Sequence, residues 1–370
     1  MTIPDWQPGP SNRWSFQHVD EIVSSVGLSR GEGPLLELRD APLPLGPEVD
    51  DFLDRSYTDG FIVVRGRDVL YEKYLNGMIP TTQHLLQSVS KSMCSAVFGQ
   101  CVASGVVAVD APVSRYVPEL ADSAYRDATV QQVLDMTVGV QYDEGYANPD
   151  SEVQTHERVG GWRSAIPGDP IDTYAFLATL KKSGDHGKTF FYCSANTDVL
   201  AWILERVTGR GFADILATDL WAKIGAEHDA SVTVDASGFP MANGGINVTL
   251  RDLARFGRVV LDRGAGPKGQ TVIPPCWIDD TRRGGDRDAA AEEMGDVHPA
   301  GSYRNQFWIS GDSHGCFYGI GIYGQYVWMD PASDIVIAKV SSLPEADNDA
   351  VWAEHVGFFD HLTHGLLAPG

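Results

Sequence analysis

The sequence contains few cysteines and no C-x-x-C pair among them. Its 370 residues include 5 cysteines, an odd number, at wide spacings. The first residues also lack the basic segment and the apolar run of a secretory signal. Reduced thiols fit this pattern best, so we expect a cytoplasmic protein.

Long apolar runs and an excess of positive charge are also missing. No stretch approaches the ~20 apolar residues of a membrane-spanning helix, so we expect no membrane partner. The net charge is −22, from 50 acidic and 28 basic residues. Such a surface repels phosphate backbones, which argues against a nucleic-acid partner. The acidic excess serves either solubility alone or the attraction of cationic, amine-bearing substrates.

The ten histidines form no H-E-x-x-H pair. The nearest cluster, His355, His361 and His364, lies near the end of the chain in an amphipathic pattern. A surface helix explains this cluster better than a metal site does. We therefore expect neither a metal ion nor a cofactor.

The hydrophobic pattern changes twice along the chain. Strand-like alternation occurs at 61–75, which predicts a hairpin, and again between 306 and 342. Residues 1–50 are rich in proline and glycine, which predicts an irregular lead-in. Helical patterns occur at 90–105, 128–139 with Thr129 as N-cap, 172–182, 194–209, 212–225, 250–264, 272–283 and from about 347 onward.

This order predicts an α/β (α+β) fold, in which one antiparallel sheet is built from both ends of the chain and flanked by helices. We expect residues 1–131 and 251–370 to form the α/β domain. Residues 132–250 would form an inserted, mainly helical region. Within it, 138–171 is a long polar and aromatic segment, typical of a functional loop.

The segment HLLQSVSKSMCS holds the candidate nucleophile. Ser88-Val89-Ser90-Lys91 is the only Ser-x-x-Lys in the chain. Residues three apart share a helix face, so Lys91 can reach Ser88, whereas Ser90 and Ser92 point elsewhere. A serine needs a base to take its proton, and a desolvated lysine can be that base. A solvated helix face is the alternative, because four-residue matches are common by chance.

Two glycine motifs further along the chain lack the context that their chemistry requires. Residues 311–315, Gly-Asp-Ser-His-Gly, match a nucleophile elbow, which needs a helix after the serine. Residues 319–324 match G-x-G-x-x-G, which also needs a following helix to bind a dinucleotide. Strand-like sequence follows both motifs, so tight turns and close backbone approach explain these glycines better.

Three ordered motifs resemble the serine β-lactamase / penicillin-binding-protein superfamily. They are Ser-x-x-Lys at 88–91, Tyr-Cys-Ser at 192–194 and Gly-Ile-Gly at 319–321 on a predicted strand. From about Arg13 onward the chain resembles the branch of nylon-oligomer hydrolases within that superfamily. The segments that carry this likeness are HLLQSVSKS, SEVQTHER, FYCSANTDVLAW, MANGG and GIGIYGQ.

The resemblance implies a β-lactamase-like fold and a serine hydrolase that needs no cofactor. Its substrate would be a small-molecule amide of the linear 6-aminohexanoate type, cleaved through an acyl-enzyme on Ser88, and short-chain esters would also react. A carboxylesterase with little amidase activity and a non-catalytic sensor of the same fold are the alternatives. Related hydrolases also suggest a homodimer.

The resemblance also implies a role for each candidate site residue. Ser88 would be acylated, with Lys91 as its base, and Tyr192 would relay protons to the leaving amine and from the deacylating water. The backbone N–H groups of Ser88 and Ile322 would form the oxyanion hole. The remaining candidates would bind the substrate, with Glu157 in place of an aspartate that recognises its amine: Tyr146, Glu157, Asn243, Trp308 and Ser194.

The chemistry of amide hydrolysis agrees with these roles. It needs a nucleophile, a group that protonates the departing nitrogen, and donors for the oxyanion. The ordinary pKa of tyrosine is near 10, and we expect Lys91 to favour the phenolate of Tyr192. Without the resemblance, Tyr192 could be a core residue, Asn243 a turn residue and Glu157 a surface charge.

Three departures from the family pattern bear on specificity. The strand motif is Gly-Ile-Gly and lacks the Lys or His that begins this motif in lactamases and helps hold the β-lactam carboxylate, which disfavours an antibiotic substrate. Glu157 is one methylene longer than the aspartate of the branch, which shifts the expected position of the substrate amine. Tyr323 replaces a histidine, and we expect it to reshape the rim of the pocket.

Overall fold

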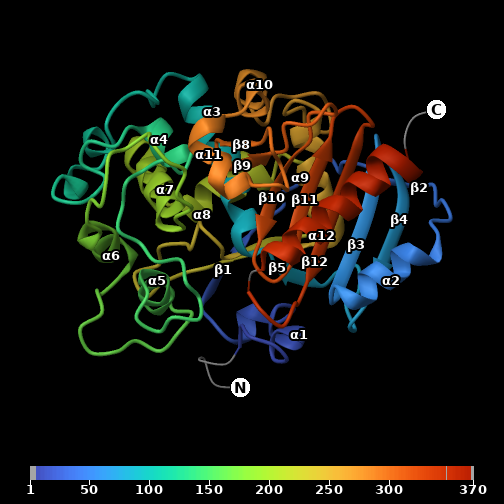
Figure 1. Ribbon diagram of the computed structural model, residues 1–370, viewed down its shortest axis with the longest axis horizontal. Helices are drawn as coiled ribbons and strands as arrows, with labels where there is room; N and C mark the ends of the chain where they lie inside the picture. The colour runs from blue at the N-terminus through green and yellow to red at the C-terminus, as the bar shows by residue number, and fades with distance from the viewer. Residues whose placement is uncertain (1–5, 347, 368–370) are drawn as a thin grey trace.

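The main sheet combines strands from the two ends of the chain (Figure 1). The computed structural model describes residues 6–346 and 348–367. All neighbouring strands are antiparallel except the first pair. The order is β2 (Arg39–Asp40), β4 (Asp68–Tyr74), β3 (Thr58–Arg65), β12 (Ile335–Ser341), β11 (Gln325–Asp330), β10 (Phe317–Gly321), β9 (Phe307–Ile309) and β8 (Ser302–Arg304).

The junction between the two ends is the pairing of β3 with β12, in which Val63 lies opposite Ile337. The hairpin expected at 61–75 is formed by β3 and β4. The prediction of one sheet built from both chain ends is therefore confirmed.

Helices cover both faces of this sheet, because successive residues of a strand point to opposite sides. Ile62 and Val64 contribute to the core beneath α9 (Leu250–Leu261), whereas Phe61 and Val63 contribute to the core beneath α2 (Pro47–Arg55) and α12 (Asp349–Asp360). Burial on both faces explains why the central strands are apolar at nearly every position.

A second sheet of four short strands connects the start of the chain to its middle. Its order is β1 (Ser25–Leu28), β6 (Ala230–Thr233), β7 (Ile246–Thr249) and β5 (Gln83–Leu85). The prediction of an irregular lead-in at 1–50 is wrong for β1 and α2, since β1 gains its order by pairing with β6. β6 and β7 fall within the region expected to be mainly helical, and the division into domains stays a prediction.

The helices of the middle region lie together beside the sheet (Figure 1). Thr129 caps α4 as expected, through a capping box with Gln132. Gly209 closes α7 in a left-handed conformation with φ of 68°. The helices are α3 (Ser90–Ala103), α4 (Val130–Leu134), α5 (Glu152–Val159), α6 (Thr173–Thr179), α7 (Ala195–Thr208) and α8 (Phe212–Ile215), which continues into a π-helical segment, Leu216–Trp221.

Some helices and one histidine differ from expectation. The segment 138–171 contains α5, and α11 (Arg287–Met294) follows the expected α10 (Pro275–Arg283). Short helical segments also lie at α1 (Asn12–Ser15), Val19–Glu21, Val113–Arg115 and Pro118–Leu120. The prediction of a surface helix is wrong for His355, which is buried and stacks on Tyr326 at 4.9 Å between ring centroids.

Within residues 6–346 and 348–367, no helix combines the length and the apolar character that crossing a bilayer requires. All five cysteines belong to the described part of the chain and carry free thiols.

Gly257 allows α9 to lie close to the sheet. A Cβ atom at this position would lie 2.6 Å from Val336 Cγ1 and 2.9 Å from Val327 Cγ2. Both contacts are to stiff, β-branched core side chains. The close packing of α9 on β11 and β12 therefore requires a glycine.

We expect Gly257→Ala to lower the free energy of unfolding by about 1–2 kcal/mol. Overpacking costs about 1–3 kcal/mol, which outweighs the gain of up to about 1 kcal/mol in helix propensity. The matched control is Gly357→Ala in α12, where a Cβ meets nothing within 4 Å, so only the gain should remain. Urea unfolding measures both. Equal shifts in the two variants would contradict the close approach.

Candidate active site

Ser88 lies on a tight turn at the start of α3. A single 3-10 turn, Gln87–Val89, precedes the helix, and Gln87 adopts a left-handed φ of 49°. The turn lies against the end of β10. A Cβ at Gly321 would lie 2.6 Å from the carbonyl oxygen of Leu86 and 3.0 Å from the Ser88 nitrogen. Glycine at 321 therefore lets the strand reach the backbone of Ser88.

Lys91 lies beside Ser88, as the three-residue spacing predicts. Its side chain is only 1% exposed. The amine donates hydrogen bonds to Ser88 Oγ at 2.8 Å, to Ser194 Oγ at 3.1 Å and to the carbonyl oxygen of Asn243 at 2.8 Å. Burial lowers the pKa of Lys91 to about 8, against the opposing influence of the Glu144 carboxylate. A neutral amine at this position is therefore accessible near neutral pH.

Tyr192 lies between this amine and the indole of Trp308. Lys91 Nζ is 5.1 Å from the centroid of the Tyr192 ring, which stacks on Trp308 at 5.9 Å. Burial and the Glu144 carboxylate raise the pKa of Tyr192 far above its usual value, while its interaction with Ser88 opposes them. The expected phenolate is thus wrong, because desolvation and a carboxylate outweigh the neighbouring lysine.

Glu144 connects two of the expected substrate contacts. Its Oε1 accepts hydrogen bonds from Ser194 Oγ at 2.5 Å and from the Tyr146 hydroxyl at 2.8 Å, and its Oε2 accepts one from the Ser194 backbone at 3.1 Å. The sequence analysis missed this residue. It lies in a loop, where no periodicity indicates which side chains point inward.

Asp198 holds Asn243, the residue whose backbone carbonyl accepts a hydrogen bond from Lys91. It is fully buried on α7 and accepts hydrogen bonds from the backbone and side-chain amides of Asn243, at 3.0 and 2.6 Å. His156 Nε2 lies 2.8 Å from the same carboxylate. Asn243 thus accepts a hydrogen bond from Lys91 with its backbone carbonyl oxygen and donates to Asp198 from its backbone and side-chain N–H groups. Asp198 could have been found, since it follows Ser194 by one helical turn.

Glu157 is buried and already paired. Its carboxylate accepts a close hydrogen bond from Arg163 Nε and another from Gln7 Nε2 at 3.1 Å. Burial raises its pKa, and Arg163 opposes that shift. The residue lines a small cavity of about 20 Å³ that Ser88 also touches.

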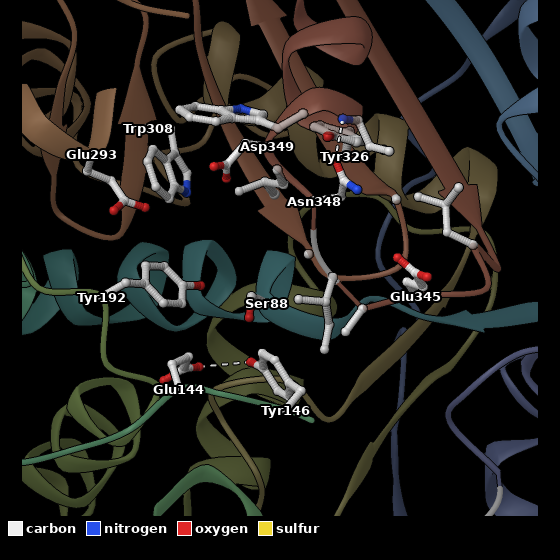
Figure 2. Close-up of a pocket in the computed structure, with 18 of the residues that line it drawn as sticks. Ser88, Glu144, Tyr146, Tyr192, Glu293, Trp308, Tyr326, Glu345, Asn348 and Asp349 are labelled. Carbon is white, nitrogen blue, oxygen red and sulfur yellow. Dashed lines mark hydrogen bonds between the residues drawn. The ribbon is translucent and has the colours of Figure 1, made fainter. Parts of the chain in front are cut away.

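A larger cavity of about 640 Å³ opens above Ser88 (Figure 2). The Tyr192 hydroxyl points toward Ser88 in this view. The volume of this cavity suits a small ligand. The wall includes the expected Tyr146, Trp308 and Ile322, and four carboxylates that the sequence analysis did not select: Glu144, Glu293, Glu345 and Asp349.

Tyr323 does not line this cavity. Its ring packs edge-on against Phe16 at 5.2 Å, in a separate apolar cluster near the start of the chain. The expectation that Tyr323 shapes the rim of the pocket is therefore wrong. Successive residues of the turn after β10 face opposite ways, so Ile322 points to the cavity and Tyr323 away from it.

Comparisons with known proteins agree on one family. The family described as Beta-lactamase matches residues 49–357. A curated 6-aminohexanoate-dimer hydrolase from Paenarthrobacter ureafaciens is 47% identical over 352 residues, which cover 94% of this chain and 89% of the relative.

Solved structures give the same result. The "Putative 6-aminohexanoate-dimer hydrolase from Bacillus anthracis" superposes with a TM-score of 0.87 at 26% identity, covering 98% of this chain and 97% of that chain. A D-stereospecific amidohydrolase from Streptomyces sp. superposes with a TM-score of 0.64 at 17% identity, over 84% of this chain and 98% of that chain. The second likeness concerns the fold alone. The β-lactamase-like fold expected from the sequence is confirmed.

Burial of Lys91 predicts a stability that rises with pH. The folded-state pKa of about 8 lies below the ordinary 10.5, so between these values the unfolded chain binds more protons. The free energy of unfolding should therefore increase by about 2 kcal/mol from pH 7.5 to pH 10. Below about pH 7 both states are protonated, and the contribution no longer changes.

Lys91→Met lacks this titration and serves as the reference. Urea unfolding of both proteins at the two pH values should show the wild type gaining about 2 kcal/mol relative to the variant. The second buried lysine, Lys339, is present in both chains and cancels. A difference that stays constant with pH would show that the pKa of Lys91 is not lowered.

Proposed function

Since the chain belongs to the β-lactamase family, we propose that it is a serine hydrolase that cleaves linear amides of the 6-aminohexanoate oligomer type. The observation that carries the proposal is the 2.8 Å hydrogen bond from a buried, readily neutralised Lys91 to Ser88, on the wall of a cavity of about 640 Å³. The curated relative of that name, 47% identical, supports the substrate class.

Acylation begins when neutral Lys91 accepts the proton of Ser88 as its oxygen attacks the amide carbon. Two backbone N–H groups, those of Ser88 and Ile322, stabilise the resulting oxyanion. Each such donor is worth about 3–4 kcal/mol of barrier. The close contact between Gly321 and the Ser88 nitrogen supports this pair.

The leaving amine needs a proton before the C–N bond breaks. Because burial and Glu144 keep Tyr192 protonated, its hydroxyl has a proton to donate to the departing nitrogen as the C–N bond breaks. Lys91 then returns the proton taken from Ser88 to Tyr192. In deacylation, water attacks the acyl-enzyme, and Tyr192 passes the proton of the water to Ser88 Oγ while the ester bond breaks.

Neighbouring polar residues position Ser88 and Lys91. Glu144 holds the hydroxyls of Ser194 and Tyr146, and the carbonyl of Asn243 holds the Lys91 amine. Trp308 stacks on Tyr192 and presents an apolar wall, which suits the methylene chain of an aminohexanoate unit. Ser194, Tyr146, Asn243 and Trp308 thus act by positioning and by contact, as the family resemblance implies.

We place recognition of the substrate amine in the large cavity and not at Glu157. Glu157 is compensated by Arg163, which leaves little charge for a second cation. We therefore assign the amine to the carboxylates of the cavity wall, Glu293, Glu345 and Asp349. A cytoplasmic location is part of the proposal, and the free thiols support it; the homodimer stays a prediction.

Ser88→Ala should reduce hydrolysis by at least about a thousandfold, because removal of a nucleophile costs more than that in serine hydrolases. A fluorophosphonate should add its mass to the wild-type peptide that contains Ser88 and leave the variant unmodified. The control is Ser313→Ala, at the exposed serine of the Gly-Asp-Ser-His-Gly turn, which should keep full activity. Full activity in Ser88→Ala would refute the nucleophile.

The same preparations separate the proposal from its rival, a carboxylesterase with little amidase activity. The 6-aminohexanoate linear dimer and a p-nitrophenyl ester are assayed side by side. Release of amine from the dimer supports the amidase. Turnover of the ester alone would favour the esterase, since an ester needs less protonation of its leaving group.

Glu293→Gln should lower kcat/KM about two- to fivefold for the linear dimer with a free amine, as expected for a solvent-exposed ion pair. The same dimer with an acetylated amine should be unaffected. Glu292→Gln is the matched control, because Glu292 is the preceding residue of α11 and does not line the cavity. Equal losses on both substrates would contradict amine recognition by Glu293.

A further inference from the structure

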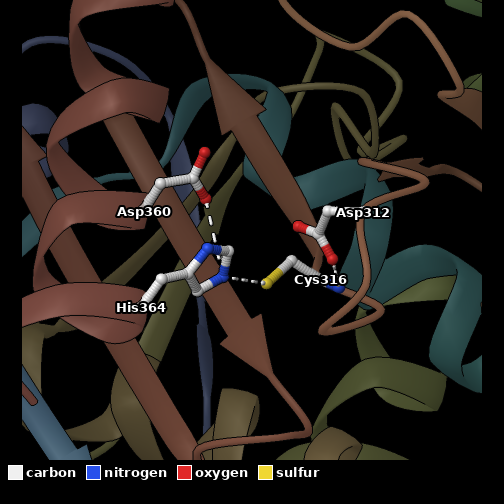
Figure 3. A group of neighbouring side chains, drawn as sticks. All are labelled: Asp312, Cys316, Asp360 and His364. Carbon is white, nitrogen blue, oxygen red and sulfur yellow. Dashed lines mark hydrogen bonds and ion pairs between the residues drawn. The ribbon is translucent and has the colours of Figure 1, made fainter. Parts of the chain in front are cut away.

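A second polar cluster lies where the last helix meets the turn between β9 and β10, away from the cavity above Ser88 (Figure 3). Asp360 ends α12, and His364 follows one turn later in the π-helical segment His361–Leu366. Asp312 and Cys316 come from the opposing turn. Two pairs of residues, each four apart, thus face each other.

The spacing of the four ligand atoms matches a coordination shell. All four lie within 4.8 Å of one another. His364 Nε2 is 3.7 Å from Cys316 Sγ and 3.8 Å from Asp360 Oδ1. The nitrogen-to-oxygen separation is too long for a good hydrogen bond. Ligands held 2.0–2.3 Å from a tetrahedral zinc ion lie about 3.3–3.8 Å apart.

Two carboxylate oxygens in the cluster lack a donor. Asp312 Oδ2 and Asp360 Oδ1 are inaccessible to solvent and have no hydrogen-bond partner among the described residues. The other oxygen of Asp312 accepts the N–H groups of Gly315 and Cys316, at 2.7 and 3.1 Å, which fixes the carboxylate. A buried unsatisfied carboxylate oxygen is costly, and a cation would satisfy both.

A second histidine and a further carboxylate lie beside the cluster. The ring of His314 lies against that of His364, with 3.7 Å between centroids, and His314 Nδ1 is 2.9 Å from Asp330 Oδ2. The same oxygen lies 3.7 Å from His364 Nε2. Asp330 is itself held by the N–H groups of Ala332 and Ser333. The stacked His314 ring and the fixed Asp330 carboxylate thus limit the orientations open to the His364 ring.

We propose that Asp312, Cys316, Asp360 and His364 bind one Zn²⁺ ion. A thiol and an imidazole beside two carboxylates select a borderline-soft transition metal over calcium or magnesium. On binding, a sulfur–zinc bond forms and the Cys316 proton passes to solvent. The expectation of no metal site, drawn from sequence spacing, is thereby revised, because the ligands lie in two segments over forty residues apart.

Four protein ligands leave no open position, so the site is structural. The ion would link α12 and the π-helical segment after it to the start of β10. That strand carries Gly319 and Gly321, and the latter lies against Ser88. The ion therefore stabilises the wall of the active site without taking part in the chemistry.

Metal binding by the full-length chain tests the site directly. The protein is stripped with a chelator and titrated with Zn²⁺ against a chromophoric chelator, and we expect one ion per chain. Cobalt substitution should give a thiolate-to-cobalt charge-transfer band, because Cys316 is a ligand. Failure to bind zinc, or a cobalt spectrum without that band, would overturn the proposal.

Variants locate the ion. Cys316→Ser and Asp360→Asn should each weaken zinc binding at least about tenfold, and Cys316→Ser should abolish the band. The matched controls are Cys276→Ser and His361→Gln, two exposed residues, which should bind as the wild type does. Circular dichroism checks folding, and if a variant does not fold the wild-type spectrum decides. Unchanged binding in folded Cys316→Ser would overturn the site.

Discussion

The buried amine of Lys91 is the interaction on which the rest of the site depends. Its three donors reach Ser88, Ser194 and Asn243, which come from the turn before α3, from the start of α7 and from the segment before β7. An amine out of contact with water is stable only if its donors are satisfied, so the three segments must pack around it. The same burial that requires this packing also lowers the pKa of the lysine and makes it a base.

Two carboxylates limit how far burial lowers the pKa of Lys91. Glu144 and Asp198 both favour the charged lysine, and so hold its pKa near 8 instead of lower. Glu144 simultaneously raises the pKa of Tyr192. One acidic side chain thus opposes the loss of charge on Lys91 and keeps Tyr192 protonated, which is the pair of states that the proposed mechanism starts from. The acids on the outer wall of the cavity, Glu293, Glu345 and Asp349, are the groups to which we assign the selection of cationic substrates.

Strand β10, which lies between β11 and β9 in the main sheet, has the candidate active site at its end and the proposed zinc cluster at its start. β10 begins beside Cys316 and ends at Gly321 against Ser88, so a clamp at its first residues restrains its last. The two-sided burial of the sheet, between α9 and the α2–α12 pair, keeps the strand fixed across its width. One short strand, β10, would therefore connect the proposed zinc site to the backbone of Ser88.

The sheet built from both chain ends, the capped helices and the pairing of Lys91 with Ser88 could be predicted from the sequence, because periodicity and three-residue spacing encode faces locally. The partners of that pair depend on how the chain folds. Glu144 lies 50 residues from Ser194 and Asp198 lies 45 from Asn243, and the packing of loops on helices brings them together. The tertiary structure also decided that Glu157 is compensated, that Tyr192 stays protonated and that Asp360 and His364 meet Cys316. Charge states depend on burial, and burial is a property of the folded chain, not of spacing.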